Sequence, residues 1–259
     1  MYQFVHTPRK ARIPRLDHRR RARHATGMTG WDASAQAWIA IQGEDGDFGR
    51  RFVLDAPMLA LVDGLAPATV LDVGCGEGRF CRMLAARGIA TCGIDPTAAL
   101  IDRARALHAD GDYRVEPAEA MTVGRFDLVV CYLSLIDMPD LDAALARIVA
   151  AIRPGGHLLI ANLTAFNTAA VHLGWLKPLI GEPSFPIDHY LEERPRRTSW
   201  AGVDIINHHR PLKRYMQALL GQGLILTHFD EPPATGGPAA KRDRYNRVPN
   251  FHIMLWQRP

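Results

Sequence analysis

The chain has 259 residues, enough for one large domain or at most two small ones. Hydrophobic residues make up 47% of it and charged residues 22%, a balance typical of a soluble globular protein. No apolar run approaches the length of a membrane span, and no charged-then-apolar secretory leader is present. These features exclude membrane-spanning and secreted classes, and we expect a cytoplasmic protein.

The net charge of +4 is unevenly distributed along the chain. Residues 1–27 carry eight basic side chains and one acidic one, which leaves the remaining residues with 23 basic against 26 acidic side chains and a net charge of −3. The segment contains Pro8 and Pro14 and lacks apolar periodicity, so it is predicted to be a disordered basic tail upstream of a natural start at Met28. The alternative is a nucleic-acid or targeting arm. Because the rest of the chain is acidic, nucleic acid is an unlikely partner.

Four cysteines occur, at Cys75, Cys81, Cys92 and Cys131. They form no C-x-x-C pair and have no partner histidines at zinc spacing, so they are predicted to be reduced, buried thiols. No cluster of ligating residues is apparent in the sequence either, and no metal site is expected.

The chain begins, after the tail, with two predicted helices. Residues 31–42 place apolar side chains near a 3.6-residue period, which indicates an amphipathic helix. A second helix is predicted over residues 50–65, with its regular part starting near Asp55 as N-cap and Pro57 in the first turn.

Short apolar strands then alternate with amphipathic helices. The predicted strands are Thr69–Val73, Ala90–Ile94, Tyr113–Val115, Phe126–Tyr132 and His157–Asn162, and the predicted helices are Arg79–Arg87, Thr97–His108 and Leu141–Ile152. This alternation predicts βαβ units and a parallel sheet that is covered on both faces. The ends of its strands should form one edge, where open α/β sheets bind ligands.

Residues 165–200 break this rhythm and contain four prolines and several aromatic residues, as expected of an inserted cover segment. Segments 188–193 and 198–207 are predicted to pair as a β-hairpin over the site. A helix at 211–221, a strand at 224–230, a loop at 231–248 and a final strand at 250–257 complete the chain.

A glycine-rich turn follows the first predicted strand. Gly74, Gly76 and Gly78 alternate after Asp72, and glycine is needed where a Cβ would block a positive φ or hold a ligand away from the backbone. An acid, Asp95, follows about 20 residues on, the spacing of a ribose-binding carboxylate. A nicotinamide or flavin site is the rival interpretation, but it requires the spacing G-x-G-x-x-G.

Four motifs lie in order between residues 70 and 162: Asp72-x-Gly74-x-Gly76-x-Gly78, Gly93-Ile94-Asp95, Phe126-Asp127-Leu128-Val129-Val130-Cys131 and Arg153-Pro154-Gly155-Gly156-His157-Leu158. With them the chain resembles the class I S-adenosylmethionine-dependent methyltransferases that act on small molecules, of the ubiquinone and menaquinone biosynthesis type (methyltransferase type 11). The resemblance implies an α/β, Rossmann-like, seven-stranded and mostly parallel sheet with an antiparallel last strand. It also implies an N-terminal helical lid and a cover insertion at about 165–207, all within one domain over residues 28–259.

The resemblance further implies S-adenosyl-L-methionine as cofactor. Asp72 would reach the methionine amino group, and Asp95 the ribose diol, unless Asp95 acts only as the N-cap that Asp95-Pro96-Thr97 also suggests. The implied cofactor-binding residues are Asp72, Gly74, Cys75, Gly76, Gly78, Asp95, Pro96, Ala118, Glu119 and Cys131. The adenine contact is the least typical, because proline follows Glu116 where the family usually has an acid.

Methyl transfer to a phenol or alcohol benefits from a base, and histidine suits that role at neutral pH. His208 and His209 precede the helix at 211–221 and are the candidate bases, with a capping or core role as the alternative. His172 and His189 in the insert are further candidates. Trp38, Ser134 and His189 are the candidate substrate contacts.

These features predict methyl transfer to a small, apolar or aromatic molecule, with O-, N- and C-methylation left open. The alternatives are an RNA-modifying methyltransferase and a cofactor-binding protein without transfer activity.

Overall fold

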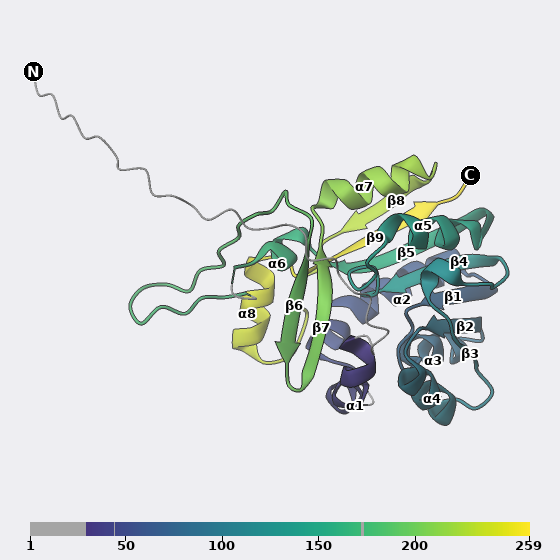
Figure 1. The fold of residues 1–259 in the computed structure, drawn as a ribbon, viewed down its shortest axis with the longest axis horizontal. Coiled ribbons are helices and arrows are strands. Elements are labelled where there is room, and N and C mark those ends of the chain that lie inside the picture. The colour runs from purple at the N-terminus through teal and green to yellow at the C-terminus, as the bar shows by residue number, and fades with distance from the viewer. Residues whose placement is uncertain (1–29, 44, 172–173) are drawn as a thin grey trace, which may run out of the picture.

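The computed structural model describes residues 30–43, 45–171 and 174–259. The predicted tail over residues 1–27 and the candidate His172 lie outside the described residues. The large sheet has seven strands in the order β3 (Asp112–Val115), β2 (Ala90–Asp95), β1 (Thr69–Val73), β4 (Phe126–Tyr132), β5 (Ile152–Leu163), β9 (Phe251–Gln257) and β8 (Ile225–Asp230) (Figure 1).

The strand directions confirm the predicted sheet. β1, β2, β3, β4 and β5 pair in parallel, whereas β9 runs antiparallel to both of its neighbours, β5 and β8. The fold is therefore α/β and Rossmann-like, mostly parallel with an antiparallel last strand. Because β1, β2 and β4 are parallel, the loops that follow them meet at one edge of the sheet.

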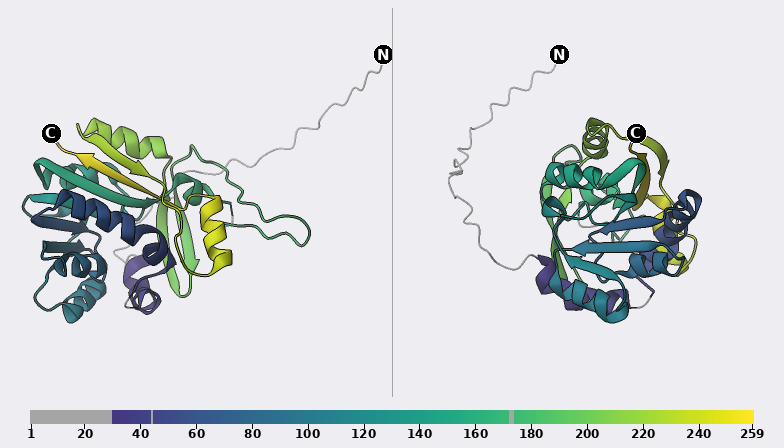
Figure 2. Two further views of the ribbon diagram at one scale, coloured as in Figure 1. Left: turned by 180° about the vertical axis from the view of Figure 1, so that it is seen from behind. Right: turned by 90° about the vertical axis from the view of Figure 1, so that its right-hand side faces the viewer.

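Helices cover both faces of this sheet, as buried strands require (Figure 2). On one face lie α2 (Asp55–Leu65) and α3 (Arg79–Ala85), whose Met58 and Leu84 pack on Val70 and Leu128. On the other lie α5 (Leu141–Ala150) and α7 (Leu212–Gly221). A further helix, α4 (Ala98–Leu107), packs beside β2 and β3. The two cores fix the sheet from both sides and hold its loop edge in place.

Two elements outside this framework cover the loop edge. The N-terminal helix α1 (Gly30–Gln42) packs against β7 (Val203–His209), which pairs with β6 (Arg194–Trp200) in a separate hairpin. The Ser34 hydroxyl donates to the Asp204 carbonyl (3.2 Å) and accepts from the Asp204 amide (2.9 Å). These two hydrogen bonds fasten the helix to the hairpin, so that the cover is one unit built from distant parts of the chain.

The position of the predicted hairpin is wrong by several residues. The structure places its turn at Ala201 and Gly202, and segment 188–193 is not a strand. Both turn residues have positive φ, +45° and +87°, as a two-residue hairpin turn requires. Gly202 is the residue in the sequence that indicates this turn. The prolines before it favoured placing the break in the chain further upstream.

Two other local predictions are also wrong. Asp55 is not an N-cap: a π-helical turn at Arg50–Leu54 leads directly into α2, and the Asp55 carboxylate instead accepts from Arg79 (2.9 Å and 2.6 Å) and the Tyr132 hydroxyl (2.8 Å). The predicted loop at 231–248 contains helix α8 (Ala239–Arg247). None of the residues of α8 is buried, so it lacks the apolar period that reveals a helix in sequence.

The segment between α6 (Ala165–Ala169) and β6 projects from the body of the molecule (Figure 1). Isolated antiparallel bridges join Ala170 to Ile187 and Leu176 to Ser184. The segment therefore lies outside the sheet that carries the loop edge.

We expect Leu145→Ala in α5 to lower the free energy of unfolding by about 2–5 kcal/mol, because the fully buried side chain would leave a cavity between α5 and the sheet. Urea denaturation followed by circular dichroism measures this change. Leu220→Ala is the control: its side chain on α7 is 55% exposed, and the change should stay within about 0.5 kcal/mol. Equal effects of the two variants would contradict the assigned core.

Candidate functional site

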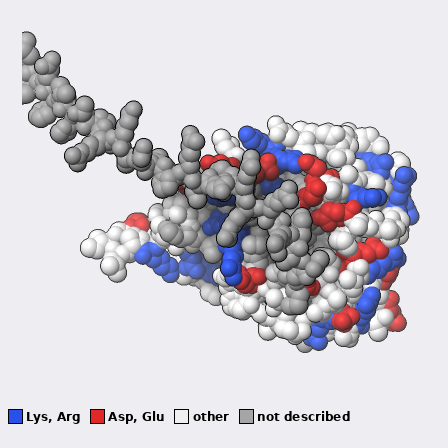
Figure 3. Space-filling model, in the orientation of Figure 1, with Lys and Arg blue, Asp and Glu red and all other residues white. Residues whose placement is uncertain are grey.

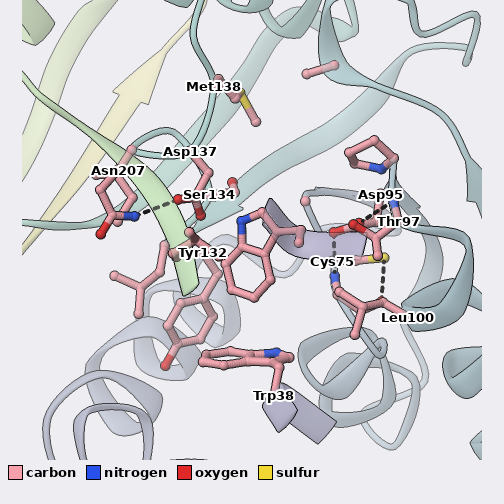
Figure 4. Close-up of a pocket in the computed structure, with 18 of the residues that line it drawn as sticks. Trp38, Cys75, Asp95, Thr97, Leu100, Tyr132, Ser134, Asp137, Met138 and Asn207 are labelled. Carbon is pink, nitrogen blue, oxygen red and sulfur yellow. Dashed lines mark hydrogen bonds between the residues drawn. The ribbon is translucent and has the colours of Figure 1, made fainter. Parts of the chain in front are cut away.

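A cavity of about 790 Å³ opens at the loop edge of the sheet, beneath α1 and the β6–β7 hairpin. Its walls come from the loops after β1, β2, β3 and β4, from α1 and from the hairpin. Figure 4 shows Asp95, Thr97 and Cys75 on one side of it and Asp137 and Asn207 on the other. The predicted residues that line it are Trp38, Asp72, Gly74, Cys75, Gly76, Asp95, Pro96, Ala118, Glu119 and Ser134.

The glycine turn forms the floor of the cavity. The amides of Gly74 and Cys75 both donate to the Ile94 carbonyl (2.8 Å and 3.0 Å), which ties the end of β1 to the end of β2. A Cβ on Gly74 would lie 2.4 Å from the Cβ of Ser134, so a side chain there would push the loop after β4 away. Gly76 has φ +57°, and a Cβ there would meet only Trp38, at 3.9 Å. Its Cα therefore faces open space where a ligand can approach the backbone.

Two of the predicted cofactor residues lie outside the cavity lining. Gly78 has φ +75°, and a Cβ there would lie 2.6 Å from the Tyr113 ring, so this glycine permits α3 to approach β3. Cys131 is fully buried in the core, and burial raises the pKa of its thiol. Both residues therefore pack behind the wall of the cavity and do not line it.

Asp95 is the last residue of β2 and not the N-cap of α4, which is Thr97, and its carboxylate faces the cavity. Its Oδ1 accepts from the Thr97 amide (2.9 Å) and its Oδ2 from the Gly76 amide (3.0 Å). A carboxylate accepts about four hydrogen bonds, so these two leave room for a diol. Burial raises the pKa of Asp95, although both amides oppose this by stabilising the anion. The N-cap role suggested from sequence is therefore wrong, and the carboxylate keeps acceptor positions for a ligand.

Asp72 is the least satisfied carboxylate of the site. It is 1% exposed, its Oδ2 accepts from the Cys81 thiol (3.5 Å), and its Oδ1 is buried without a partner among the described residues. Burial, together with the neighbouring Asp95 and Glu77, raises the pKa of Asp72 to about 7, although the Cys81 thiol opposes the rise. A buried carboxylate of this kind is stabilised when a cation binds beside it. The orphaned oxygen therefore marks a place for an ammonium group.

The loops after β2 and β3 line the same half of the cavity with Pro96, Thr97, Leu100, Ala118 and Glu119. These residues combine apolar surface with few charges, as a heterocycle requires. Thr97 and Leu100 were not singled out in the sequence, and no motif distinguishes them.

Aromatic side chains form the opposite wall. The Trp38 ring makes edge contacts with Trp31 (5.3 Å between centroids) and Trp200 (6.3 Å), which brings α1 and the hairpin together. The guanidinium of Arg50 lies over the rings of Trp38 (4.9 Å) and Tyr132 (5.6 Å). This wall offers flat apolar surface beside polar groups, the usual composition of a small-molecule site.

The structure does not bring the predicted histidines to the cavity, and that part of the site prediction is corrected. His209 is fully buried, with Nδ1 hydrogen-bonded to the Thr168 hydroxyl (2.7 Å) and Nε2 to the Tyr190 carbonyl (2.9 Å). His208 points to a separate surface depression, and His189 is exposed beside Glu192 (2.8 Å). No histidine of the described residues lines the cavity.

Ser134 and its neighbours show how the loop after β4 shapes the site. The Ser134 hydroxyl donates to the Val73 carbonyl (2.6 Å), so it joins two loops and has a structural role. Leu133 adopts φ +60°, an uncommon value for a residue with a Cβ. Further along this loop Asp137 lines the cavity and accepts from the Asn207 amide (2.6 Å). Asp137 was not singled out from the sequence, because no motif there marks it as a site residue.

The charge of the cavity wall favours a cationic ligand. Asp72, Asp95 and Asp137 all line it, and in the described part of the chain none of the three forms an ion pair. The two arginines of the wall are occupied by other acids, Arg50 by Asp47 (2.8 Å) and Arg79 by Asp55 (2.6 Å). No group of three or more metal-ligating side chains occurs among the described residues.

A family model described as a methyltransferase domain matches residues 48–217, more than half of the chain. A ubiquinone biosynthesis O-methyltransferase of Alkalilimnicola ehrlichii is 33% identical over 159 residues, which is 58% of this chain and 64% of the relative. One of Rhodopseudomonas palustris (strain BisB18) is 35% identical over 120 residues, 44% of this chain and 46% of the relative. The chain thus matches less than two thirds of the length of these relatives.

Solved structures agree with this family. An S-adenosylmethionine dependent methyltransferase from Mesorhizobium loti is 26% identical, with a TM-score of 0.71 over 83% of this chain and 100% of that one. The glycopeptide N-methyltransferase MtfA, solved with S-adenosyl-L-methionine, shares the fold at 16% identity, with a TM-score of 0.56 over 79% of this chain and 93% of that one. The chain therefore belongs to the methyltransferase domain family, within the class I S-adenosylmethionine-dependent methyltransferases that its four motifs resemble.

Proposed function

We propose that this protein transfers a methyl group from S-adenosyl-L-methionine to a small, apolar or aromatic acceptor. The single observation that carries the proposal is the buried, partnerless Oδ1 of Asp72 at the floor of the cavity. An ammonium group there would satisfy it, as the amino group of the cofactor's methionine moiety would. The Asp95 carboxylate, one strand away, would hold the ribose diol, and the loops after β2 and β3 would hold the adenine.

Bound in this way, the cofactor supplies an electrophilic methyl group on a sulfonium. Methyl transfer is an in-line displacement, and much of the acceleration comes from holding the acceptor close and aligned. The aromatic wall of Trp31, Trp38 and Trp200 is suited to holding a flat acceptor. The curated relatives named above methylate oxygen in ubiquinone biosynthesis, and a phenolic acceptor is one candidate here.

An RNA acceptor is a weaker alternative. On the face shown in Figure 3, acidic and basic side chains are interspersed instead of forming one basic surface. The acidic cavity wall would also repel a phosphate backbone. A protein that binds the cofactor without transferring its methyl group is the third possibility, and the fold alone does not decide between activity and binding.

We further propose that residues 28–259 form one methyltransferase domain with a cover insertion at about 165–207. We also propose that it works in the cytoplasm, because its four cysteines are free and buried. None of the helices in the described part of the chain is both long and apolar enough to cross a membrane.

Two measurements test the proposed activity. Calorimetry with S-adenosyl-L-methionine and S-adenosylhomocysteine should show binding, whereas NAD⁺ and FAD should not bind. Methyl-labelled S-adenosyl-L-methionine is then offered with a panel of phenols, alcohols, aromatic amines and RNA. We expect label in a phenol, alcohol or amine. Label in RNA would favour an RNA-modifying methyltransferase. Cofactor binding without any labelled product would favour a cofactor-binding protein without transfer activity.

We expect Asp95→Ala to weaken S-adenosyl-L-methionine binding by about 1–3 kcal/mol, roughly 5- to 150-fold in Kd, because the diol loses its acceptor. Calorimetry measures the change in affinity. Thermal unfolding measures how much stability is lost with the hydrogen bonds from the Gly76 and Thr97 amides to Asp95. Asp102→Ala is the control, since this acid on α4 is exposed and outside the cavity. Unchanged affinity in Asp95→Ala would remove the ribose role.

Asp72→Asn should weaken cofactor binding and at the same time stabilise the free protein at alkaline pH. Since burial raises the pKa of Asp72 to about 7, the stability that its proton provides is lost as the pH rises from about 4 through 7. Asparagine does not titrate, so the stability of the variant relative to the natural chain should rise by about 2–3 kcal/mol from pH 5 to pH 8. Denaturant unfolding at both pH values measures this. The exposed Asp63→Asn should show no such difference, and a pH-independent gap for Asp72→Asn would contradict the assignment.

A further inference from the structure

We propose that Asp137 is the general base of this enzyme, and that the acceptor carries a hydroxyl or amino group whose proton Asp137 takes. The inference rests on the proposed function and narrows its acceptor to protic groups. The position of the Asp137 carboxyl group in the cavity supports it.

Asp137 lies in the half of the cavity that the cofactor-binding loops do not form. In Figure 4, Asp137 faces the cavity opposite Asp95, and Asn207 lies beside it. Trp38 and Tyr132 also face the cavity. Its Oδ1 accepts from the Asn207 amide (2.6 Å), and Asn207 belongs to β7 of the cover hairpin. The Trp31 side chain of α1 also stabilises its carboxylate. Both partners come from the cover, so Asp137 stands where the cover closes over an acceptor.

The geometry leaves this carboxylate able to accept a proton. Asn207 and Trp31 are neutral donors, and Asp137 forms no ion pair among the described residues. Since a carboxylate has about four acceptor positions, two neutral donors orient it without filling it. An acceptor hydroxyl or amine can therefore hydrogen-bond to the same group.

The other titratable groups of this half of the cavity have structural partners. Asp47 pairs with Arg50 (2.8 Å), and the Tyr132 hydroxyl donates to Asp55 (2.8 Å). Asp140 caps α5 by accepting from the Ala143 amide (3.0 Å). The remaining phenol, Tyr245, has its pKa raised to about 12 by burial. Asp137 is the group in this half that is placed to exchange a proton near neutral pH.

Charged and polar groups from several elements surround Asp137. Burial and the Asp95 carboxylate at the end of β2 raise its pKa to about 7, while Asn207, Trp31 and Arg50 oppose the rise. From α7, Tyr215 faces the same region. Arg210 binds the carbonyls of Leu135, Met138 and Pro139 in the loop that carries Asp137 (3.1, 2.6 and 3.1 Å). A carboxylate whose pKa is raised toward neutrality is suited to general-base catalysis near pH 7.

The reaction balances with this base. The O–H or N–H bond of the acceptor breaks, and its proton goes to the Asp137 carboxylate. A lone pair of the acceptor oxygen or nitrogen would form the bond to the methyl carbon, and the bond from that carbon to sulfur would break with its electron pair left on sulfur. The electrons of the broken O–H or N–H bond would stay on the acceptor atom. The sulfonium becomes a neutral thioether, S-adenosylhomocysteine, and Asp137 returns its proton to solvent when the product leaves.

The first test compares Asp137→Asn with the natural chain, using the labelled phenols, alcohols and amines of the panel. We expect the rate of transfer at saturating cofactor to fall about 10²- to 10⁴-fold, and the Kd for S-adenosyl-L-methionine to change less than about threefold. Asp63→Asn, an exposed acid outside the cavity, should transfer at the natural rate. A comparable Kd shows that Asp137→Asn is folded at the site, and transfer within threefold of the natural rate would then overturn the inference.

The second test uses Asn207→Ala as a positioning variant. Since Asn207 donates to the ionised form, its loss should raise the pKa of Asp137 and shift the acid limb of the rate–pH profile upward by about 1–2 units. Transfer by Asn207→Ala should recover at pH 9, where Asp137 is ionised in both proteins. An equal loss at all pH values indicates a merely structural role and counts against the inference.

Different results would contradict the proposed function and the role of Asp137. If the natural chain binds the cofactor but labels no member of the panel, the proposed function fails and this inference fails with it. If the natural chain labels an acceptor and Asp137→Asn does so equally well, or if only carbon is labelled, the function stands and the role of Asp137 falls.

Discussion

The site depends on the Asp95 carboxylate, which joins two loops that the sheet alone leaves apart. It accepts from Gly76 after β1 (3.0 Å) and from Thr97 after β2 (2.9 Å), and so holds the glycine turn at a fixed distance from the start of α4. Because neither amide is bonded within a strand or helix ladder, this side chain supplies their acceptor. The same oxygens face the cavity, so the group that organises the loops is also placed to bind a ligand.

Placing three carboxylates without ion-pair partners in one cavity, two of them buried and Asp137 half-buried, is costly for the free protein, and this cost is informative about the ligand. The pKa of Asp72 and of Asp137 is raised to about 7, mainly by burial and in part by the nearby Asp95 carboxylate. A cationic ligand removes this electrostatic cost. The carboxylates that destabilise the free protein therefore stabilise its complex with the ligand. The division of roles follows position: Asp72 and Asp95 lie on the sheet edge, while Asp137 is held by the cover.

The cover explains why the acceptor half of the site was less accessible to sequence reasoning than the cofactor half. The glycine turn and Asp95 follow their strands at fixed spacing, so local chemistry revealed them. Asp137 becomes visible only when Asn207, 70 residues away, is folded beside it. The prediction of His209 as a base is wrong for the opposite reason. Its local sequence suits a base, but in the folded chain both ring nitrogens are hydrogen-bonded, one to Thr168 and the other to the Tyr190 carbonyl.

The sequence indicated the succession of strands and helices along the chain, the parallel sheet, the glycine turn and the acid at the end of β2, because these follow from periodicities and backbone requirements within a few residues. The order of the strands within the sheet came from the tertiary structure. The bounds of β1 and β4 were predicted to the residue. Only the tertiary structure decided where the cover hairpin turns, that α8 is a helix, and which polar groups reach the cavity. These features depend on contacts between distant segments, such as Ser34 with Asp204, whose energies no local pattern encodes.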